Sequence, residues 1–369
     1  MIKTALRLIK TIEDHGYIAY IVGGFVRDQL LGISSNDIDI CTSARPSDIR
    51  NIFPNSCLPN EAYGSVTVVI KNIRFEITTF RKEIKYLNNR KPIEFEYIDN
   101  LIDDLNRRDF RINTICMDKN GKIIDLLNGR QDLDKREINV VGDGILKFTE
   151  DSLRILRAVR FATSLNFSLS SETKQSVLQT RHYVRNLSYD RKKEELNKIF
   201  GSVNVRYGTK LLIELGLDQE LQLVRLKDIK NFDDLIGVWA QLNVEDIYPF
   251  TKNEKELMKS IRKLLKLDTI DSFSLYHYGL YVSSVVADIK GIDRKVITKA
   301  YNDLPIKCRS DIIMNGKDIM KLLNCKPGDY LRVILNDIEN KILCKELVND
   351  RKILESYLIE NYGGTQNEY

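Results

Sequence analysis

The spacing of apolar residues changes near residue 147 of the chain. Before that point, alternating segments that favour strands are interspersed with helical segments, beginning with an opening helix that ends near His15-Gly16 and a strand from Tyr17 to Val22. From Lys147 onward, apolar residues recur three and four positions apart, which predicts one helix after another to the C-terminus. The sequence therefore predicts an α+β protein, in which residues 1–145 form an α/β module and a long all-α part follows.

Further elements are predicted within the N-terminal module. The segments Ser65–Ile70 and Arg74–Phe80 have the character of two strands and predict a β-hairpin that turns near Lys71-Asn72. Pro46 favours the start of a helix, because proline suits the first turn. The segment Arg111–Met117 is predicted to be another strand.

Two aspartates lie on a short apolar segment that follows a glycine pair. In an extended strand alternate residues project to the same face, so Asp37 and Asp39 would share one face while Ile38 and Ile40 pack on the other. The pair Gly23-Gly24 precedes a helix-like stretch, where backbone N–H groups can approach a triphosphate. Paired carboxylates are the hard ligands that suit Mg²⁺ when phosphate supplies the remaining oxygens. The alternative interpretation is a strand that ends in a solvated, aspartate-rich turn.

Carboxylates of this kind are what nucleotidyl transfer with two metal ions requires. One ion lowers the pKa of the attacking hydroxyl, and the other steadies the leaving pyrophosphate. Asp37 and Asp39 are therefore the candidate catalytic residues and metal ligands. Glu76 alternates with apolar neighbours on a predicted strand, and it is either a third ligand or the wet side of a half-buried strand.

Basic residues accompany these acids. Arg27 lies one turn into the helix after the glycine pair, where a phosphate contact is expected. Residues 106–113 contain three arginines, of which Arg108 could hold phosphate, and Asp109 could hold a ribose hydroxyl. A solvated basic turn is the alternative interpretation of this segment.

The segment Glu150–Phe161 is predicted to form one helix with two stripes. Asp151 and Arg154 are three residues apart and would share a helix face, which Arg157 and Arg160 continue. An apolar row about a hundred degrees round the helix would anchor it. That row consists of Leu153, Leu156 and Val159.

The couple formed by Asp151 and Arg154 has the donor and acceptor pattern that a nucleobase edge requires. Asp151 can accept a hydrogen bond from the exocyclic amine of cytosine or adenine, while Arg154 donates to the ring nitrogen beside it. Uracil and guanine present the reverse order, and the buried polar groups left unpaired would make the discrimination large. The alternative is a surface salt bridge between residues i and i+3, which is frequent on helices.

Composition narrows the class of protein. The 369 residues are 43% hydrophobic, which allows a real core, and the net charge of +5 is compatible with an RNA partner. Six scattered cysteines without a Cys-x-x-Cys pair indicate reduced thiols of a cytoplasmic protein. With only three histidines, a zinc cluster or a His-based hydrolase site is disfavoured. We expect neither a membrane-spanning segment nor a signal peptide.

Four motifs follow one another along the chain: Gly23–Asp28, Asp37–Asp39, Arg107–Asn113 and Glu150–Arg154. In order and spacing they resemble the class II tRNA nucleotidyltransferase and bacterial poly(A) polymerase family. Two segments between them resemble its CCA-adding members, namely Tyr63–Val69 and Phe75–Arg81. Two segments beyond them are also similar to the family, namely Gly208–Leu217 and Ile313–Ile319. The resemblance covers nearly the whole chain.

This resemblance implies a seahorse-shaped protein with a polymerase-beta-like nucleotidyltransferase head and a helical neck, body and tail. On this chain these parts would be residues 1–145, 146–203, 204–295 and 296–369. The implied reaction is template-independent addition of CCA to the 3′ end of tRNA from CTP and ATP, with release of pyrophosphate. The tRNA would be held at its 3′ end and its elbow.

The resemblance also implies roles for single residues. Mg²⁺ would be bound by Asp37 and Asp39. The nucleotide would be contacted by Gly24, Arg27 and Arg108. Asp151 and Arg154 would read the base. Two further arginines would help nearby, namely Arg157 and Arg160.

One segment, and two departures from the family's usual sequence, bear on which nucleotides the protein would add. Residues Lys82–Asn100 are polar and occupy the position of a flexible loop that helps family members switch from C to A addition; enzymes that add only C lack this loop. The neck motif has Asp190 and Lys192 where a glutamate and an apolar residue are usual, and the usual acid is missing from Asn88–Pro92. An A-adding enzyme or a poly(A) polymerase is therefore an alternative, as is an inactive RNA-binding or chaperone-like module. The sequence leaves the oligomeric state open.

Overall fold

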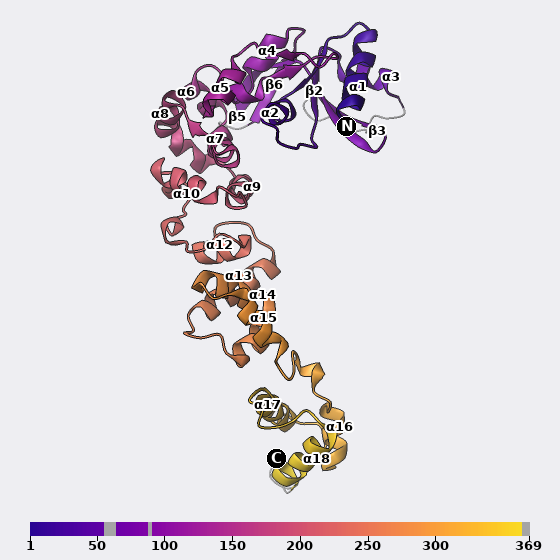
Figure 1. Ribbon diagram of the computed structural model, residues 1–369, viewed down its shortest axis with the longest axis vertical. Helices are drawn as coiled ribbons and strands as arrows, with labels where there is room; N and C mark the ends of the chain where they lie inside the picture. The colour runs from indigo at the N-terminus through magenta and orange to yellow at the C-terminus, as the bar shows by residue number, and fades with distance from the viewer. Residues whose placement is uncertain (55–63, 88–90, 364–369) are drawn as a thin grey trace. The chain divides into compact units, whose positions relative to one another are not determined.

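The structure is a computed structural model, and it describes residues 1–54, 64–87 and 91–363. The chain divides into two compact units: unit 1 comprises residues 1–227 and 247–249, and unit 2 comprises residues 228–246 and 250–369. Strands gather in the indigo-to-purple part of the ribbon in Figure 1, and helices dominate from α7 (Leu153–Leu165) onward. The predicted α+β order is confirmed.

Unit 1 contains a six-stranded sheet in the order β3-β4-β2-β1-β7-β8. Its strands are β1 (Ala19–Val22), β2 (Asp39–Thr42), β3 (Ser65–Ile70), β4 (Ile73–Thr79), β7 (Cys116–Met117) and β8 (Ile123–Ile124). Strand β2 runs parallel to β4, whereas β1 is antiparallel to β2 and β7. The predicted hairpin is confirmed as β3 and β4. Its turn residues Lys71 and Asn72 have φ of 51° and 62°, the positive values that a tight two-residue hairpin turn favours.

Short helices accompany this sheet. They are α1 (Ile2–Asp14), α2 (Gly24–Leu30), α3 (Pro46–Ile52), α4 (Leu101–Asn106) and α5 (Gly129–Lys135). The opening helix ends at Asp14, as predicted, and its buried residues Ala5, Leu8, Ile9 and Ile12 form the apolar stripe of an amphipathic helix. Pro46 is the first residue of α3, which confirms the predicted helix start.

Two predictions in the N-terminal module are wrong in part. The strand expected at Arg111–Met117 begins with a 3₁₀ turn over Arg111–Asn113, and only Cys116–Met117 pairs as β7. Local hydrogen bonds override the strand pattern here, since the Asn113 N–H donates to the Phe110 carbonyl and the Asn113 side chain donates to Asp109.

The loop expected at Lys82–Asn100 is a β-hairpin instead. Strands β5 (Arg81–Leu87) and β6 (Lys91–Tyr97) pair antiparallel in a separate two-stranded sheet. Two arginine–aromatic contacts lie where β5 begins and β6 ends. The Arg45 guanidinium is 4.9 Å from the Tyr97 ring centroid, and the Arg81 guanidinium is 5.5 Å from that of Phe95. Residues 88–90 lie outside the described residues. They are part of the segment Asn88–Pro92, from which the family's usual acid is missing.

The helix predicted across Glu150–Phe161 is two helices. Helix α6 (Gly144–Glu150) ends before Asp151, whose φ and ψ of −141° and 98° are extended, and α7 begins at Leu153. The Asp151 carboxylate accepts the Leu153 N–H at 3.1 Å and so acts as a cap for the new helix. Asp151 therefore precedes the helix that carries Arg154.

The rest of unit 1 is mainly helical. Its helices are α8 (Ser171–Thr180), α9 (Tyr189–Phe200), α10 (Val205–Glu214) and α11 (Leu217–Glu220), with 3₁₀ turns at Arg181–Asn186 and Leu226–Asp228. The expectation of helices alone after Lys147 is wrong at one point, because β10 (Ser168–Leu169) pairs in parallel with β9 (Glu137–Ile138). Helix α7 packs against α9 and α10 and is buried along most of its length.

Within its described residues, the regular secondary structure of unit 2 consists of helices. Its helices are α12 (Leu235–Leu242), α13 (Lys252–Leu265), α14 (Ser272–Lys290), α15 (Arg294–Asn302), α16 (Gly316–Leu323), α17 (Tyr330–Leu343) and α18 (Arg351–Tyr362), with a 3₁₀ turn at Arg309–Asp311. Aspartates cap several of them, as Asp271 does for α14. A core that includes Ile297, Ile319, Ile338 and Leu354 joins α15 to α18.

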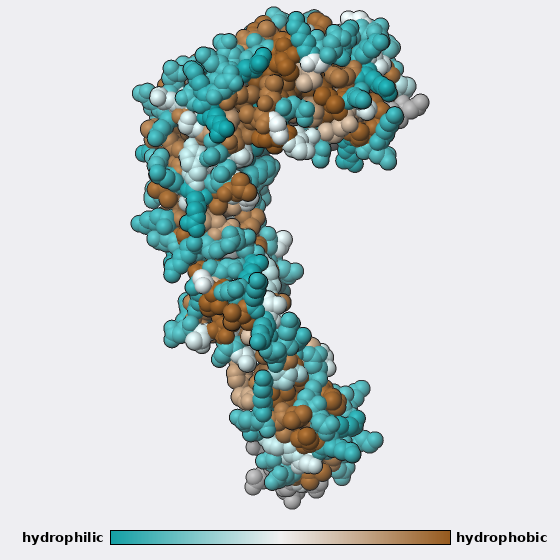
Figure 2. All heavy atoms as spheres, in the orientation of Figure 1, coloured by the Kyte–Doolittle hydropathy of each residue, from teal (hydrophilic) through white to brown (hydrophobic). Residues whose placement is uncertain are grey.

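In the view of Figure 2, teal hydrophilic residues dominate, and the largest brown area lies over the part of unit 1 that carries the sheet. Among the described helices, none has both the length and the apolar character that crossing a bilayer demands. The five cysteines within the described ranges are free thiols.

Candidate active site

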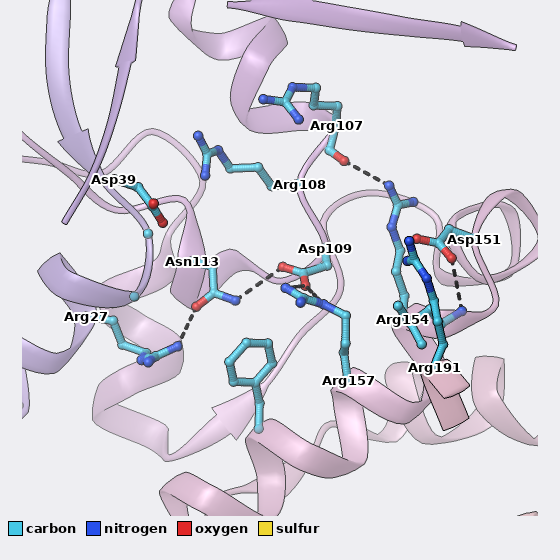
Figure 3. A pocket seen from close by; sticks show the side chains of 14 residues that line it. Arg27, Asp39, Arg107, Arg108, Asp109, Asn113, Asp151, Arg154, Arg157 and Arg191 are labelled. Atoms are coloured by element: carbon cyan, nitrogen blue, oxygen red, sulfur yellow. Dashed lines mark hydrogen bonds and ion pairs between the residues drawn. The ribbon is translucent and has the colours of Figure 1, made fainter. Parts of the chain in front are cut away.

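A pocket of about 480 Å³ lies in unit 1 between the sheet-bearing part and α7. Arginines and aspartates dominate its lining. The lining residues are Gly23, Gly24, Arg27, Asp39, Arg107, Arg108, Asp109, Asn113, Asp151, Leu153, Arg154, Arg157, Phe161 and Arg191. Figure 3 shows the ten labelled side chains arranged around a shared space. The excess of arginine over aspartate suits an anionic ligand.

The glycine turn forms one wall of this pocket. Gly23 has φ 83° and ψ −139°, a conformation that side-chain-bearing residues rarely adopt. A Cβ at this position would lie 3.9 Å from an Asp39 carboxylate oxygen and 3.8 Å from Arg108 Nη1. Gly24 is the first residue of α2. The turn therefore brings the backbone close to Asp39 and Arg108.

The acids of the Asp-x-Asp segment lie where β2 begins. Asp39 is the first residue of β2 and stands opposite Glu76 on β4, and Asp37 precedes the strand. Ile38 and Ile40 are buried, whereas Asp37 and Glu76 are exposed, so the predicted alternation is confirmed. Among the described residues, Asp39 lines the pocket while Asp37 and Glu76 do not.

Asp39 carries a strongly perturbed carboxyl group. Burial first, and then the charges of Asp37 and Glu76, raise its pKa to about 6, while Arg108 opposes this rise. Asp37 and Glu76 are thus close enough to repel the Asp39 carboxylate at the edge of the pocket. An incoming cation would relieve that repulsion.

The two neighbouring arginines of the pocket are held by one acid that sequence reasoning missed. Asp104 on α4 is completely buried. Its Oδ1 accepts from Arg107 Nε at 2.8 Å, and its Oδ2 lies 3.2 Å from Arg108 Nη2. The spacing of three and four residues from Asp104 to the arginines was a signal in the sequence that could have found this contact.

Asp109 makes a chain of contacts across the pocket. Burial disfavours its charge, yet Arg157 and Asn113 outweigh burial and lower its pKa to about 2. Its Oδ2 accepts from Arg157 Nε at 2.7 Å, and its Oδ1 accepts from Asn113 Nδ2 at 3.2 Å. Arg27 Nη1 donates to Asn113 Oδ1 at 2.7 Å. Both carboxylate oxygens of Asp109 are therefore engaged by protein groups, as Figure 3 shows.

Asp151 and Arg154 lie next to each other at the other end of the pocket (Figure 3). Arg154 is buried, and its Nη2 donates to the Arg107 carbonyl at 3.1 Å while its Nη1 donates to the Lys147 carbonyl at 3.2 Å. Burial raises the pKa of Asp151, and the charges of Arg154, Arg157 and Arg191 oppose that rise. The structure brings the predicted couple together, although through a helix start rather than along one helix face.

Three family models match this chain. Residues 19–139 match the poly A polymerase head domain, residues 166–223 match the probable RNA and SrmB-binding site of polymerase A, and residues 241–358 match putative domain 2 of tRNA nucleotidyltransferases. The CCA-adding enzyme of Lactococcus lactis subsp. lactis (strain IL1403) is 36% identical over 373 residues, which cover 93% of this chain and 94% of the relative. That of Geobacillus sp. (strain WCH70) is 33% identical and covers 96% of both chains.

This chain belongs to the CCA-adding enzyme family. Its fold agrees with a solved structure, the Bacillus stearothermophilus CCA-adding enzyme in complex with CTP, with a TM-score of 0.85, 29% identity and 96% of each chain covered. Thermotoga maritima CCA-adding enzyme complexed with tRNA has the same fold, with a TM-score of 0.70 and 21% identity. Membership of this nucleotidyltransferase family implies the use of a divalent metal ion.

In this CCA-adding enzyme family member, some predicted site residues line the pocket and others do not. The residues in the pocket lining are Gly24, Arg27, Asp39, Arg108, Asp109, Asp151, Arg154 and Arg157. Within the described part of the chain, Arg160 is not among them. Its Nε donates to Glu195 Oε2 at 2.6 Å instead, and its guanidinium lies over the Phe161 ring.

The sequence predicted no role for four residues that line the pocket of this CCA-adding enzyme family member. They are Arg107, Asn113, Phe161 and Arg191. Arg107 and Asn113 belong to the motif that also contains Arg108 and Asp109, and Arg191 lies between Asp190 and Lys192 of the neck motif. Phe161 lies outside the apolar row of Leu153, Leu156 and Val159, and a single aromatic residue in a predicted helix is typical of a helix core.

Proposed function

We propose that this protein adds CCA to the 3′ end of tRNA without a nucleic-acid template. It transfers CMP, CMP and then AMP from CTP and ATP to the 3′ hydroxyl and releases pyrophosphate. The observation that carries the proposal is that Asp39 and the couple Asp151–Arg154 border one pocket, in a chain that matches CCA-adding enzymes over 93% or more of its length.

The acids at the pocket edge fit a divalent cation. Within the described ranges, no group of three or more His, Cys, Asp or Glu side chains forms a metal site by itself. Phosphate oxygens of the nucleotide would therefore complete the coordination, as is usual for Mg²⁺. We propose Mg²⁺ held by Asp37 and Asp39, with Glu76 as the candidate third ligand. When bound, the metal ions activate the tRNA 3′ hydroxyl and stabilise the leaving pyrophosphate.

Side chains on the opposite wall would select the base. The Asp151 carboxylate can accept from the exocyclic amine of cytosine or adenine, and the Arg154 guanidinium can donate to the adjacent ring nitrogen. Arg154 is fixed by the carbonyls of Arg107 and Lys147, which supports a rigid reading geometry. Uracil and guanine would place a carbonyl against the carboxylate, and they would be rejected.

The triphosphate would lie between these two ends of the pocket. The Gly24 backbone and the guanidinium groups of Arg27 and Arg108 are the proposed contacts. Arg108 is fixed by Asp104, and Arg27 is fixed by Asn113 and Asp28. Guanidinium groups held in this way are pre-organised for phosphate oxygens.

The helical remainder of the chain would bind tRNA. We propose the division into head (1–145), neck (146–203), body (204–295) and tail (296–369), with body and tail along the tRNA up to its elbow. Recognition would depend mainly on the shape of the RNA, with a salt-dependent contribution from lysine and arginine. We also propose a cytoplasmic location, which the free thiols support.

Product length on a defined tRNA tests the proposed activity. A tRNA that lacks CCA is incubated with CTP alone, with ATP alone and with both. The expected products are two nucleotides longer with CTP and three nucleotides longer with both. A long A tail would indicate a poly(A) polymerase, and addition of A without C would indicate an A-adding enzyme. The absence of any product with intact tRNA binding would indicate an inactive RNA-binding module.

A further inference from the structure

Phe161 on α7 borders the nucleotide pocket but is only 7% exposed. Three guanidinium groups surround its ring. The distance from the ring centroid is 4.0 Å to Arg160, 5.2 Å to Arg27 and 5.3 Å to Arg157. Each is within the range at which a cation is attracted to the negative face of an aromatic ring.

Three like charges around one ring repel one another unless each has its own partner. Arg160 pairs with Glu195 at 2.6 Å, and Arg157 pairs with Asp109 at 2.5 Å. Arg27 pairs with Asp28 at 2.7 Å. Each guanidinium is thus held by an acid on one side and shares the Phe161 ring on the other.

Two of these arginines are also joined through the pocket floor. Arg27 donates to Asn113, Asn113 donates to Asp109, and Arg157 donates to the other oxygen of Asp109. Because Arg27 and Arg157 also lie against the same ring, the chain of hydrogen bonds is closed through Phe161. A shift of either arginine would disturb both the hydrogen-bond chain and the ring contact.

The ring itself is fixed from within the core. Phe110, which is fully buried, lies edge-to-face against Phe161 with a centroid distance of 5.6 Å and an angle of 77°. Such a pair restricts rotation of the ring. An aliphatic side chain of similar size could fill the space but would offer no attraction to the arginines.

We propose that Phe161 is a positioning residue that holds Arg27 and Arg157 at a fixed separation within the nucleotide pocket. It acts through these arginines and does not itself contact the substrate. It joins α2, which carries the proposed phosphate contact, to α7, which begins beside the proposed base-reading couple. This inference rests on the proposed nucleotide-binding function of the pocket.

The affinity of the full-length protein for CTP and for ATP, measured without tRNA by calorimetry, tests this role. In Phe161→Leu we expect the dissociation constants of CTP and ATP to rise about tenfold and by the same factor, because neither arginine reads the base. At saturating nucleotide and tRNA, kcat should stay within threefold of the wild type. Phe161→Tyr retains the ring and should restore most of the affinity.

A matched control separates this role from general loss of core packing. Phe148 on α6 is fully buried in the same unit and is not a lining residue, so Phe148→Leu should leave nucleotide affinity within twofold. If Phe161→Leu does not fold, Phe161→Met replaces it, because methionine adapts to the space without providing a ring. A double-mutant cycle with Arg27→Gln should show that most of the Phe161→Leu effect is lost once Arg27 is absent.

Three results would overturn the inference. These are an unchanged affinity in a folded Phe161→Leu protein, an equal loss in Phe148→Leu, or a Tyr variant as weak as the Leu variant. Failure of the proposed function is distinguishable from each, because it would appear as wild-type protein that binds nucleotide but adds no CCA to tRNA.

Discussion

Asp39 and Glu76 stand directly opposite each other on the parallel strands β2 and β4. Residues paired in register project from the same face of a sheet, so the two carboxylates share the face at the pocket edge. Burial first, and then the charges of Asp37 and Glu76, raise the pKa of Asp39 to about 6. This arrangement is unfavourable for the acids alone and favourable once a cation lies between them.

Removing each acid should therefore change the metal requirement in a different way. We expect Asp39→Asn to lose at least a thousandfold in kcat while tRNA affinity stays within twofold. Glu76→Gln should remain active but should need several-fold more Mg²⁺ for half-maximal rate, because one anionic group near the site is lost. Mg²⁺ titrations of CMP incorporation measure both effects, with Asp134→Asn, an exposed acid of α5, as the control. A Glu76→Gln enzyme with an unchanged Mg²⁺ requirement would exclude Glu76 as a ligand.

The proposed base-reading couple, Asp151 and Arg154, gives a prediction on specificity. In Asp151→Asn, the side-chain amide can turn its N–H₂ toward a carbonyl, so the acceptor demanded by cytosine and adenine is no longer fixed. We expect kcat/KM for CTP and ATP to fall at least tenfold and the preference over UTP and GTP to shrink by a larger factor. Single-nucleotide incorporation on tRNA with each of the four triphosphates measures this. Retention of full discrimination in the variant would mean that the base is read elsewhere.

Much of the site could be predicted because its residues lie in short local patterns. The alternation of Asp37, Ile38, Asp39 and Ile40 defines which side chains are buried, and it needs no tertiary information. The glycine pair likewise indicates a turn that other residues would not adopt. In the structure the turn and the first residue of β2 then meet, with Asp39 close to Gly23.

The contacts that are distant in sequence could not be predicted in this way. Periodicity alone extended one helix through Asp151, whereas the Asp151 carboxylate caps a new helix at Leu153. Arg160 continues the arginine row of α7, yet the position of Glu195 on α9 draws it away from the pocket lining. Both outcomes depend on which side chain is nearby in space.

A buried acid outside the active site predicts a dependence of stability on pH. Asp132 on α5 is 2% exposed, its Oδ1 accepts from Asn139 Nδ2 at 2.9 Å, and its Oδ2 has no hydrogen-bond partner among the described residues. Burial raises its pKa to about 6, while Arg111 opposes the rise. The folded pKa is above the ordinary value, so the fold is favoured when the carboxyl group is neutral. This stabilisation is fully present below pH 4 and is lost as the pH rises through 6.

Asp132→Asn keeps the shape and stays neutral. We expect it to raise the free energy of unfolding by about 2 kcal/mol at pH 8 and to have little effect at pH 4.5. Thermal melts across this pH range measure the difference. A stabilisation that is equal at both pH values would show that charge at Asp132 is not the cause.

The departure of the neck motif at Lys192 leads to the last prediction. Lys192 on α9 is 2% exposed, its Nζ donates to the neutral carbonyl of Arg185 at 3.2 Å, and it lies 4.4 Å from the Tyr189 ring centroid. Burial lowers its pKa, so the charged form is less stable here than in water despite both contacts. Lys192→Met retains the buried stem and removes the charge, and it should raise the free energy of unfolding by about 1 kcal/mol at pH 7. The gain should shrink as the pH approaches 10, because the wild-type amine then becomes neutral in the folded state.

Thermal melts at pH 7 and pH 10 measure this gain in stability. The control is Lys210→Met, which removes an exposed charge from α10 and should change stability by less than about 0.5 kcal/mol. A Lys192→Met protein that is less stable than the wild type at pH 7 would contradict this prediction. The contacts with Arg185 and Tyr189 would then outweigh the cost of burying the ammonium group on α9.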